Sequence, residues 1–299
     1  MTTVERVLSF DYFMSLSNII KELTYFGAYD PIQVWEGYCK YIEKSESHKQ
    51  KPIPTKGFQK ISGFSLEGLQ ELYKERGLAL VLMHYGNYRY TKSTILNAIM
   101  KIKAEKPVLL VVDEESYKSE SQFEVIAKLY SELNIQMIIA ENASSGLRIA
   151  RHLKNGGIVV LYLDGMTGYG KDKSPIRVPF ISSEISLRSG FFRLLEKTQV
   201  PVIGAISPTD DELLISLPII SDKFEATASS LMSFFRQTLL ADPSQWRLWY
   251  RHHLFVEGLP NTMNMQKKPN TTTWICNQVS PKIMLEEETG DVYQYMETN

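Results

Sequence analysis

The sequence has little cysteine and no excess of either charge, and each shortage excludes a class of protein. Only two of its 299 residues are cysteines, Cys39 and Cys276, and the five histidines do not stand near them at the spacing of metal ligands. We therefore expect no disulfide framework and no metal site, and we interpret both thiols as reduced. The 33 basic and 34 acidic side chains nearly cancel, whereas a protein that binds nucleic acid carries a clear basic excess. We expect no nucleic-acid partner.

Long apolar runs are also missing. The longest, Leu78 to Met83, suits one buried strand, and none approaches the roughly 20 residues of a membrane-spanning helix. Glu5 and Arg6 interrupt the region where a secretory signal would need its apolar core. We expect a cytoplasmic protein. Peripheral contact with the inner membrane stays open, because the helix predicted from Val4 has both apolar and charged faces.

From about residue 63, short apolar runs alternate with segments of helical periodicity. The predicted strands are 78–83, 107–112, 135–139, 158–163, 200–206 and 213–219, and the predicted helices are 65–77, 87–102, 121–133, 144–153, 187–197 and 225–240. Buried strands separated by amphipathic helices are typical of an α/β protein with a mainly parallel central sheet covered by helices on both faces.

The chain divides into three segments. Residues 1–58 are predicted to form N-terminal helices, over about 4–45, and a polar connector. Residues 59–260 form the α/β domain. Residues 261–299 lose the alternating pattern and are rich first in Asn, Thr and Lys and then in acidic residues. We expect an irregular C-terminal tail there.

Three polar residues directly follow predicted strands, where reactive groups of open α/β sheets gather. His84 follows the strand at 78–83, Asp164 the one at 158–163, and Asp113 the one at 107–112. A neutral imidazole held on a rigid strand end can accept a proton near neutral pH, and a carboxylate can orient it. The structural alternatives are a histidine that only packs and aspartates that only start turns.

Other polar positions are less specific. Asn87 can cap the helix after His84, and Arg188 begins a helix whose positive end and guanidinium could hold a phosphate or an oxyanion. Residues 165–171 resemble a phosphate-binding loop, but the hydroxyl expected at 172 is absent and Pro175 follows, which argues against a nucleotide hydrolase. No G-x-S-x-G sequence is present, which argues against a serine hydrolase.

Five motifs occur in one order along the chain. They are residues 84–89 (HYGNYR), 156–164 (GGIVVLYLD), 178–180 (VPF), 198–202 (TQVPV) and 243–251 (PSQWRLWYR). Together they resemble the lipid A biosynthesis (late) acyltransferase family, within the wider lysophospholipid acyltransferase group. The resemblance covers about residues 63–254 and implies a glycerolipid acyltransferase-like fold.

The resemblance implies transfer of an acyl group from a thioester to a hydroxyl or an amine. The donor would be the phosphopantetheine thioester of an acyl carrier protein or a coenzyme A thioester, with no bound cofactor. The histidine of the motif, here His84, would be the general base, oriented by an acidic residue five positions on. From the residues themselves we expect Asp164 as a catalytic carboxylate and Asn87, Arg89, Asp113 and Arg188 as substrate-binding residues. The acceptor would be a small molecule or a lipid of a specialised lipid or natural-product pathway.

The sequence departs from the family at Arg89, where members carry an acidic residue that orients the histidine. Three interpretations remain open. Asp164, or less plausibly Asp113, pairs with His84 instead; the acceptor is an amine that needs a weaker base; or the chain is a catalytically silent lipid- or carrier-binding protein on the same fold. The membrane-spanning N-terminal helix common in the lipid A enzymes is also missing, so we expect an acceptor other than lipid A.

Overall fold

The computed structural model describes residues 5–24, 26–48, 58–100, 106–165, 168, 174–257, 273–280 and 282–294. The chain divides into two compact units. Unit 1 contains Met1–Glu43, Pro179–Ile185 and Pro243–Asn299, and unit 2 contains Lys44–Val178 and Ser186–Asp242. Each unit is therefore assembled from segments that are far apart in the sequence.

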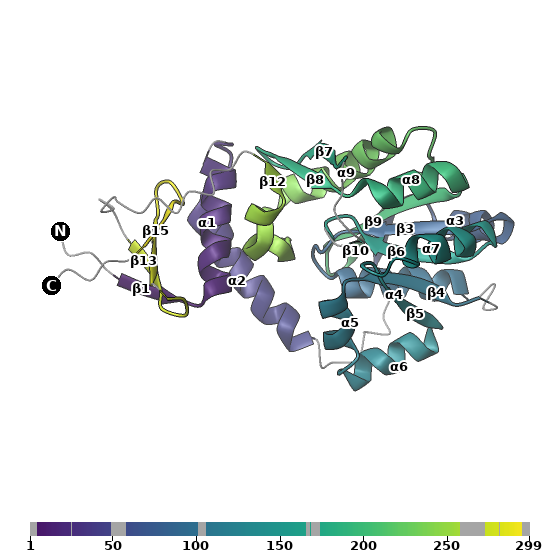
Figure 1. Ribbon diagram of the computed structural model, residues 1–299, viewed down its shortest axis with the longest axis horizontal. Helices are drawn as coiled ribbons and strands as arrows, with labels where there is room; N and C mark the ends of the chain where they lie inside the picture. The colour runs from purple at the N-terminus through teal and green to yellow at the C-terminus, as the bar shows by residue number, and fades with distance from the viewer. Residues whose placement is uncertain are drawn as a thin grey trace. The chain divides into compact units, whose positions relative to one another are not determined.

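Unit 2 is built on an eight-stranded sheet (Figure 1). Its strands are β2 (Lys60–Gly63), β3 (Leu78–Leu82), β4 (Val108–Val112), β5 (Ile135–Ile139), β6 (Ile158–Tyr162), β9 (Pro201–Thr209), β10 (Glu212–Ile215) and β11 (Ile219–Ile220). Seven run in the order β2-β10-β9-β3-β6-β4-β5, and β11 pairs with β9. The five strands from β9 to β5 are parallel neighbours, whereas β10 and β11 are antiparallel to β9.

Helices cover both faces of this sheet. They are α3 (Leu66–Glu75), α4 (Tyr88–Met100), α5 (Glu114–Glu120), α6 (Glu124–Glu132), α7 (Ser145–Lys154), α8 (Ser189–Thr198) and α9 (Phe224–Ala241). Leu78, Leu80 and Leu82 pack with side chains of α3, α4 and α6 in one core. Gly204 lets α9 approach the sheet, because an added Cβ would stand 3.0 Å from the Phe234 ring. The core thus holds β3 rigidly in the centre of the sheet.

Unit 1 contains helices α1 (Phe10–Thr24) and α2 (Pro31–His48, whose last five residues belong to unit 2) and a small sheet. That sheet has the order β1 (Glu5–Leu8), β13 (Thr273–Cys276), β14 (Ile283–Glu286) and β15 (Val292–Gln294). The 3-10 helices are η1 (Pro243–Gln245) and η2 (Arg247–Leu254), of which η2 packs against α1, and β12 (Val256–Glu257) pairs with β8 (Glu184–Leu187). The remaining strand, β7, is Ile176–Pro179.

The coarse prediction of an α/β protein is confirmed, and the main sheet is mixed. The structure differs from the predictions for the two ends of the chain. The first residues form β1, a strand, because their parallel partner β13 lies in the C-terminal segment, which a local pattern does not reveal. That segment contains three strands although we expected it to be irregular; residues 258–272 and the connector at 49–57 lie outside the described residues.

The apolar stripe of α1 is buried within unit 1 through Phe13, Leu16, Ile19 and Leu23. These side chains are therefore not a free surface for a membrane. Within the described part of the chain, every helix is too short or too polar to span a bilayer.

Candidate active site

His84 and Asp164 are in direct contact at the carboxyl edge of the main sheet. His84 Nδ1 lies 2.8 Å from Asp164 Oδ1, and the His84 backbone N–H donates to Asp164 Oδ2 at 3.0 Å. The Asp164 side chain is only 2% exposed, while that of His84 is 23% exposed. A buried carboxylate thus holds both the backbone and the ring of a histidine that solvent can reach.

The strand register explains this contact. β3 and β6 are parallel neighbours, and Leu82 stands opposite Tyr162. His84 and Asp164 each lie two residues beyond that pair, so they leave the sheet at the same level and on the same face. Of the alternatives that the sequence left open, the structure brings Asp164 to the imidazole.

Two tyrosines surround the imidazole. The Tyr162 ring stacks on His84 with centroids 4.1 Å apart and planes at 22°, and the Tyr88 ring meets His84 edge-on at 5.1 Å. Tyr88 and Tyr162 also contact each other at 5.6 Å. Burial raises the pKa of Tyr162 well above its ordinary value, so its phenol stays neutral. The ring of His84 is therefore fixed by aromatic contacts as well as by Asp164.

Arg89 takes part in a different interaction from the one expected at the motif's acidic position. Its Nη2 lies 3.6 Å from Glu120 Oε1, at the end of α5. The other carboxylate oxygen of Glu120 accepts a hydrogen bond from the Tyr130 hydroxyl, and Lys92 Nζ donates to the same hydroxyl at 3.0 Å. Sequence reasoning missed Lys92, Glu120 and Tyr130, because nothing in the local pattern connects α4, α5 and α6.

Asn87 and Asp113 both act as helix caps. Asn87 Oδ1 accepts the Tyr90 N–H at 3.4 Å at the start of α4. Asp113 is the N-cap of α5 and accepts the Ser116 N–H. Both side chains therefore have a structural role as helix caps. For Asp113, this agrees with the alternative that the aspartates only start turns.

Arg188 lies against the loop that follows Asp164. It precedes α8, and an added Cβ on Gly168 would stand 2.8 Å from Arg188 Nη1. The glycine therefore allows the guanidinium to approach the loop backbone. Most of the segment 165–171 lies outside the described residues.

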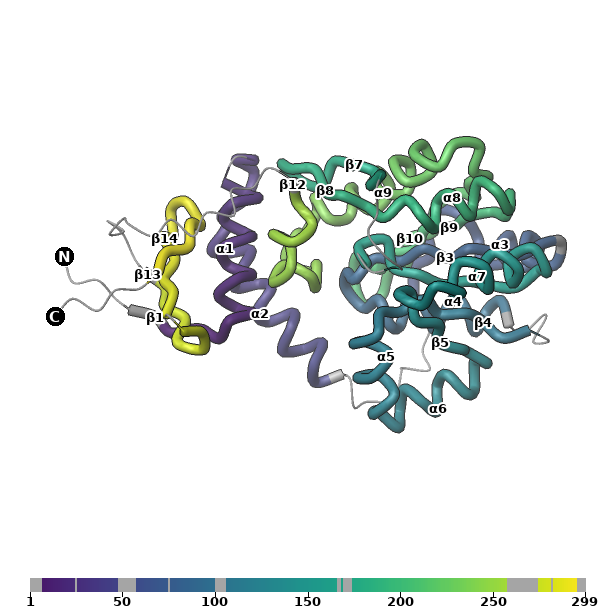
Figure 2. Tube along the Cα trace, in the orientation of Figure 1, coloured from purple at the N-terminus to yellow at the C-terminus, as the bar shows by residue number. Residues whose placement is uncertain are grey.

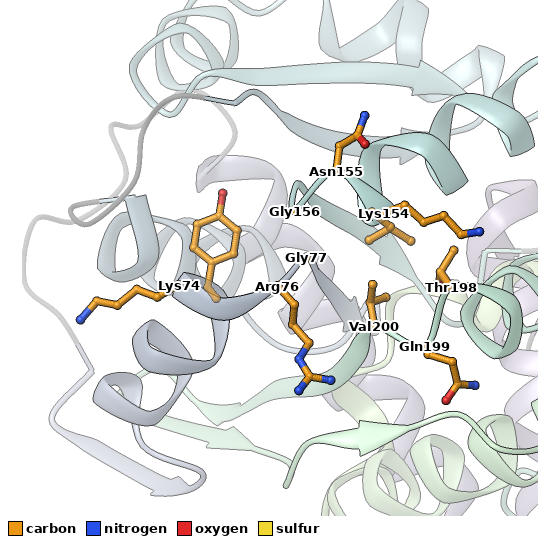
Figure 3. A pocket seen from close by; sticks show the side chains of 11 residues that line it. Lys74, Arg76, Gly77, Lys154, Asn155, Gly156, Thr198, Gln199 and Val200 are labelled. Atoms are coloured by element: carbon orange, nitrogen blue, oxygen red, sulfur yellow. The ribbon is translucent and has the colours of Figure 1, made fainter.

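A cavity of about 580 Å³ lies where β3, β6 and β9 begin, whereas His84 follows the end of β3; Figure 3 shows residues that line the cavity. The C-terminal ends of α3, α7 and α8 line it, with the basic side chains Lys74, Arg76 and Lys154. Helix C-termini carry partial negative charge, which nearby basic side chains complement. The basic residues are thus explained by the helix ends, and we assign no site to this cavity.

Two of the sequence motifs meet in unit 1, where their aromatic residues form a core. Phe180 contacts Trp246 at 4.7 Å and Trp249 at 6.0 Å between ring centroids, and both tryptophans are fully buried. Trp249 Nε1 donates to the Pro243 carbonyl at 2.7 Å. These contacts give the motifs at 178–180 and 243–251 a structural role.

Among the described residues, no three His, Cys, Asp or Glu side chains come together as metal ligands. Comparison of the sequence with protein-family models and with curated proteins gives no match. The geometry of the site therefore has to support any functional conclusion.

Proposed function

We propose that the chain is an acyltransferase that moves an acyl group from a thioester to a hydroxyl or an amine, on a glycerolipid acyltransferase-like fold. The observation that carries this proposal is the pair formed by His84 and Asp164, 2.8 Å apart at a strand end. A carboxylate that accepts the Nδ1 proton fixes the tautomer and leaves Nε2 as the basic nitrogen.

The reaction follows from that tautomer. His84 Nε2 takes the proton of the acceptor O–H or N–H, and the acceptor atom attacks the thioester carbonyl carbon. The tetrahedral intermediate collapses when the carbon–sulfur bond breaks, and the imidazolium returns its proton to the leaving thiolate. Asp164 stabilises the imidazolium between these two steps, as the buried acid of a catalytic triad does.

The donor and its binding residues complete the proposal. We assign the donor to the phosphopantetheine thioester of an acyl carrier protein or to acyl coenzyme A. Arg188 is suited to a donor phosphate, because guanidinium groups bind phosphates in a bidentate manner. Arg89 and Asn87 stand at the start of α4, next to His84, where an acceptor would enter. We place the reaction in the cytoplasm, with a small-molecule or lipid acceptor.

The test is turnover of a panel of acyl carriers and acyl coenzyme A thioesters with candidate acceptors. Released thiol and the mass of the acylated product are both measured. His84→Ala should reduce both rates by roughly 10²- to 10⁴-fold, the usual contribution of general base catalysis. His253→Ala, in unit 1, is the matched control and should keep the wild-type rate.

Full activity of His84→Ala would contradict the proposal. Tight binding of an acyl carrier without any acylated product would instead favour the catalytically silent alternative.

A further inference from the structure

Four polar side chains from three helices form a continuous row beside the candidate site. Lys92 donates to Tyr130, Tyr130 donates to Glu120, and Glu120 pairs with Arg89. Arg89 and Lys92 belong to α4, Glu120 ends α5, and Tyr130 lies in α6. Of these helices, α5 and α6 contact β5 (Figures 1 and 2).

The row contains two cations and one anion. Lys92 is 2% exposed, and its amine contacts the Tyr130 ring as well as the hydroxyl. Arg89 and Glu120 are partly buried, at 25% and 16% side-chain exposure, so solvent screens their interaction less than it would at the surface. Glu120 is thus the anion in the row that offsets the charge of Arg89.

Arg89 is separated from the imidazole by a single aromatic ring. Its Cζ lies 5.5 Å from the centroid of Tyr88, whose ring contacts both His84 and Tyr162. A cation near an imidazole disfavours its protonated form, and a carboxylate paired with that cation removes the effect. The balance between Arg89 and Glu120 therefore bears on the basicity of His84.

We propose that Glu120 is a positioning residue of the His84 site, which offsets the charge of Arg89 and holds it against Tyr88. This inference rests on the proposed function. Glu120 contacts no reacting atom in this scheme. It acts through Arg89 and the two tyrosines, and Tyr130 and Lys92 hold its carboxylate in place.

Three groups outside the row share in its electrostatics. They are Tyr88 of α4, Tyr162 of β6 and Asp164 in the loop after β6. Burial lowers the pKa of Lys92 to about 8, although Glu120 raises it and Arg89 lowers it further. In wild type, Lys92 is therefore mostly protonated between pH 5 and 7, whereas Glu120→Gln removes the charge that raises its pKa.

The test uses three variants and the pH dependence of His84. Glu120→Gln leaves Arg89 uncompensated, so the acid limb of the pH–kcat/KM profile should move to lower pH and kcat should fall several-fold, with KM changed less than kcat. Arg89→Gln removes the cation beside Tyr88 and should move the limb to higher pH. The double variant should return it to the wild-type position. A purely structural role would not give opposite shifts that cancel.

A second readout does not need activity. Nuclear magnetic resonance of the histidine ring protons, with His84 identified by its loss in His84→Ala, should show the same opposite shifts of its titration midpoint. Glu120→Asp keeps the carboxylate and should keep the wild-type midpoint. Glu114→Gln, an exposed acid of the same helix, is the matched control and should leave it unchanged.

The outcomes separate this inference from the proposed function. An unchanged His84 midpoint in both Glu120→Gln and Arg89→Gln overturns the inference, even where His84→Ala is inactive. Shifts of the same sign in the two single variants also overturn it. Full activity of His84→Ala with opposite midpoint shifts overturns the proposed function and leaves the electrostatic coupling supported. If Glu120→Gln does not fold, the His84 midpoint in Arg89→Gln decides. A shift to higher pH supports the inference, and an unchanged midpoint overturns it.

Discussion

Glu22 Oε2 lies 2.9 Å from His252 Nε2, and both side chains are fully buried in unit 1. The other carboxylate oxygen, Oε1, accepts the backbone N–H groups of Ile181, Ser182 and Ser183 at 3.2, 2.7 and 2.9 Å. The Ser183 hydroxyl also donates to Oε2. One carboxylate of α1 thus joins two other segments of unit 1, the turn at 181–183 and η2.

Glu22→Gln should strongly destabilise unit 1. The amide cannot accept all these donors at once, and a buried His252 would lose its anionic partner. Breaking a buried pair in this way costs about 3–5 kcal/mol. Urea denaturation followed by tryptophan fluorescence measures the change. The exposed acid of α2, Glu36, gives the control: Glu36→Gln should stay within about 0.5 kcal/mol of wild type.

The same carboxylate predicts an acid transition. Burial alone would raise the pKa of Glu22, but the hydrogen bond and charge of His252 and the hydrogen bonds from Ser183 outweigh it and lower the pKa from 4.5 to about 2. Because the folded-state pKa lies below the unfolded one, this stabilisation is complete above pH 4.5 and is lost as the pH falls toward 2. The loss is of the order of 3 kcal/mol. Denaturation in urea at pH 5 and pH 3 should show about 2 kcal/mol of this loss in wild type. An equal loss of stability in Glu22→Gln over the same pH range would contradict the prediction.

Most elements of unit 2 follow from the sequence, although β2, α5 and β7 have no counterpart among the predicted elements. Predicted strands at 78–83 and 158–163 appear as β3 and β6, and Ser65, the first residue of the helix predicted at 65–77, caps α3 by accepting the Gly68 N–H at 2.9 Å. These signals are local, since periodicity and capping act within one element. The pairing of β1 with β13 joins residues about 270 positions apart and has no such signal.

The candidate site also has a part that the sequence predicts and a part that it does not. His84 and Asp164 were predicted because each follows a strand, but their contact depends on β3 and β6 being neighbours, which the strand order decides. Glu120, Tyr130 and Lys92 meet only through the packing of three helices. A sequence shows which residue ends an element and leaves open which elements pack together.

Lys92→Met should stabilise the protein at neutral pH. Burial lowers the pKa of Lys92 from 10.5 to about 8, so the unfolded chain binds the proton more tightly than the folded one. Stability should therefore rise as the pH increases from about 8 toward 10.5, and the buried charge costs about 3 kcal/mol below pH 8. Methionine fills similar space without that charge.

Denaturation at pH 7 and pH 9.5 measures this effect; tyrosines of the unfolded chain begin to ionise at the higher pH, but they do so equally in wild type and in the variant. Wild type should gain stability between the two values relative to Lys92→Met. Lys128→Met, at a 78% exposed side chain of α6, should keep the wild-type dependence. Parallel curves for wild type and Lys92→Met would contradict the prediction.

Gly63→Ala should destabilise unit 2 where Gly190→Ala does not. Gly63 has a φ of +86°, and an added Cβ would stand 2.0 Å from the Ile215 carbonyl oxygen of the neighbouring strand β10. Separating those backbones should cost about 2 kcal/mol or more. Gly190 begins α8 in open space, so alanine there should gain up to about 1 kcal/mol. Thermal unfolding of both variants measures the difference. Similar losses of stability in Gly63→Ala and Gly190→Ala would contradict the prediction.

Asp164→Asn tests the role of the carboxylate while keeping its shape. An amide beside Nδ1 can donate its N–H to that nitrogen, which places the imidazole proton on Nε2 and removes the base. We expect kcat to fall by roughly 10²- to 10⁴-fold with little change in KM, because the acceptor proton is moved only in the transition state. Asp113→Asn is the comparison: asparagine caps a helix as well as aspartate does, so α5 and the wild-type kcat should be retained. Equal losses in the two variants would mean that the carboxylate serving His84 is not specifically Asp164.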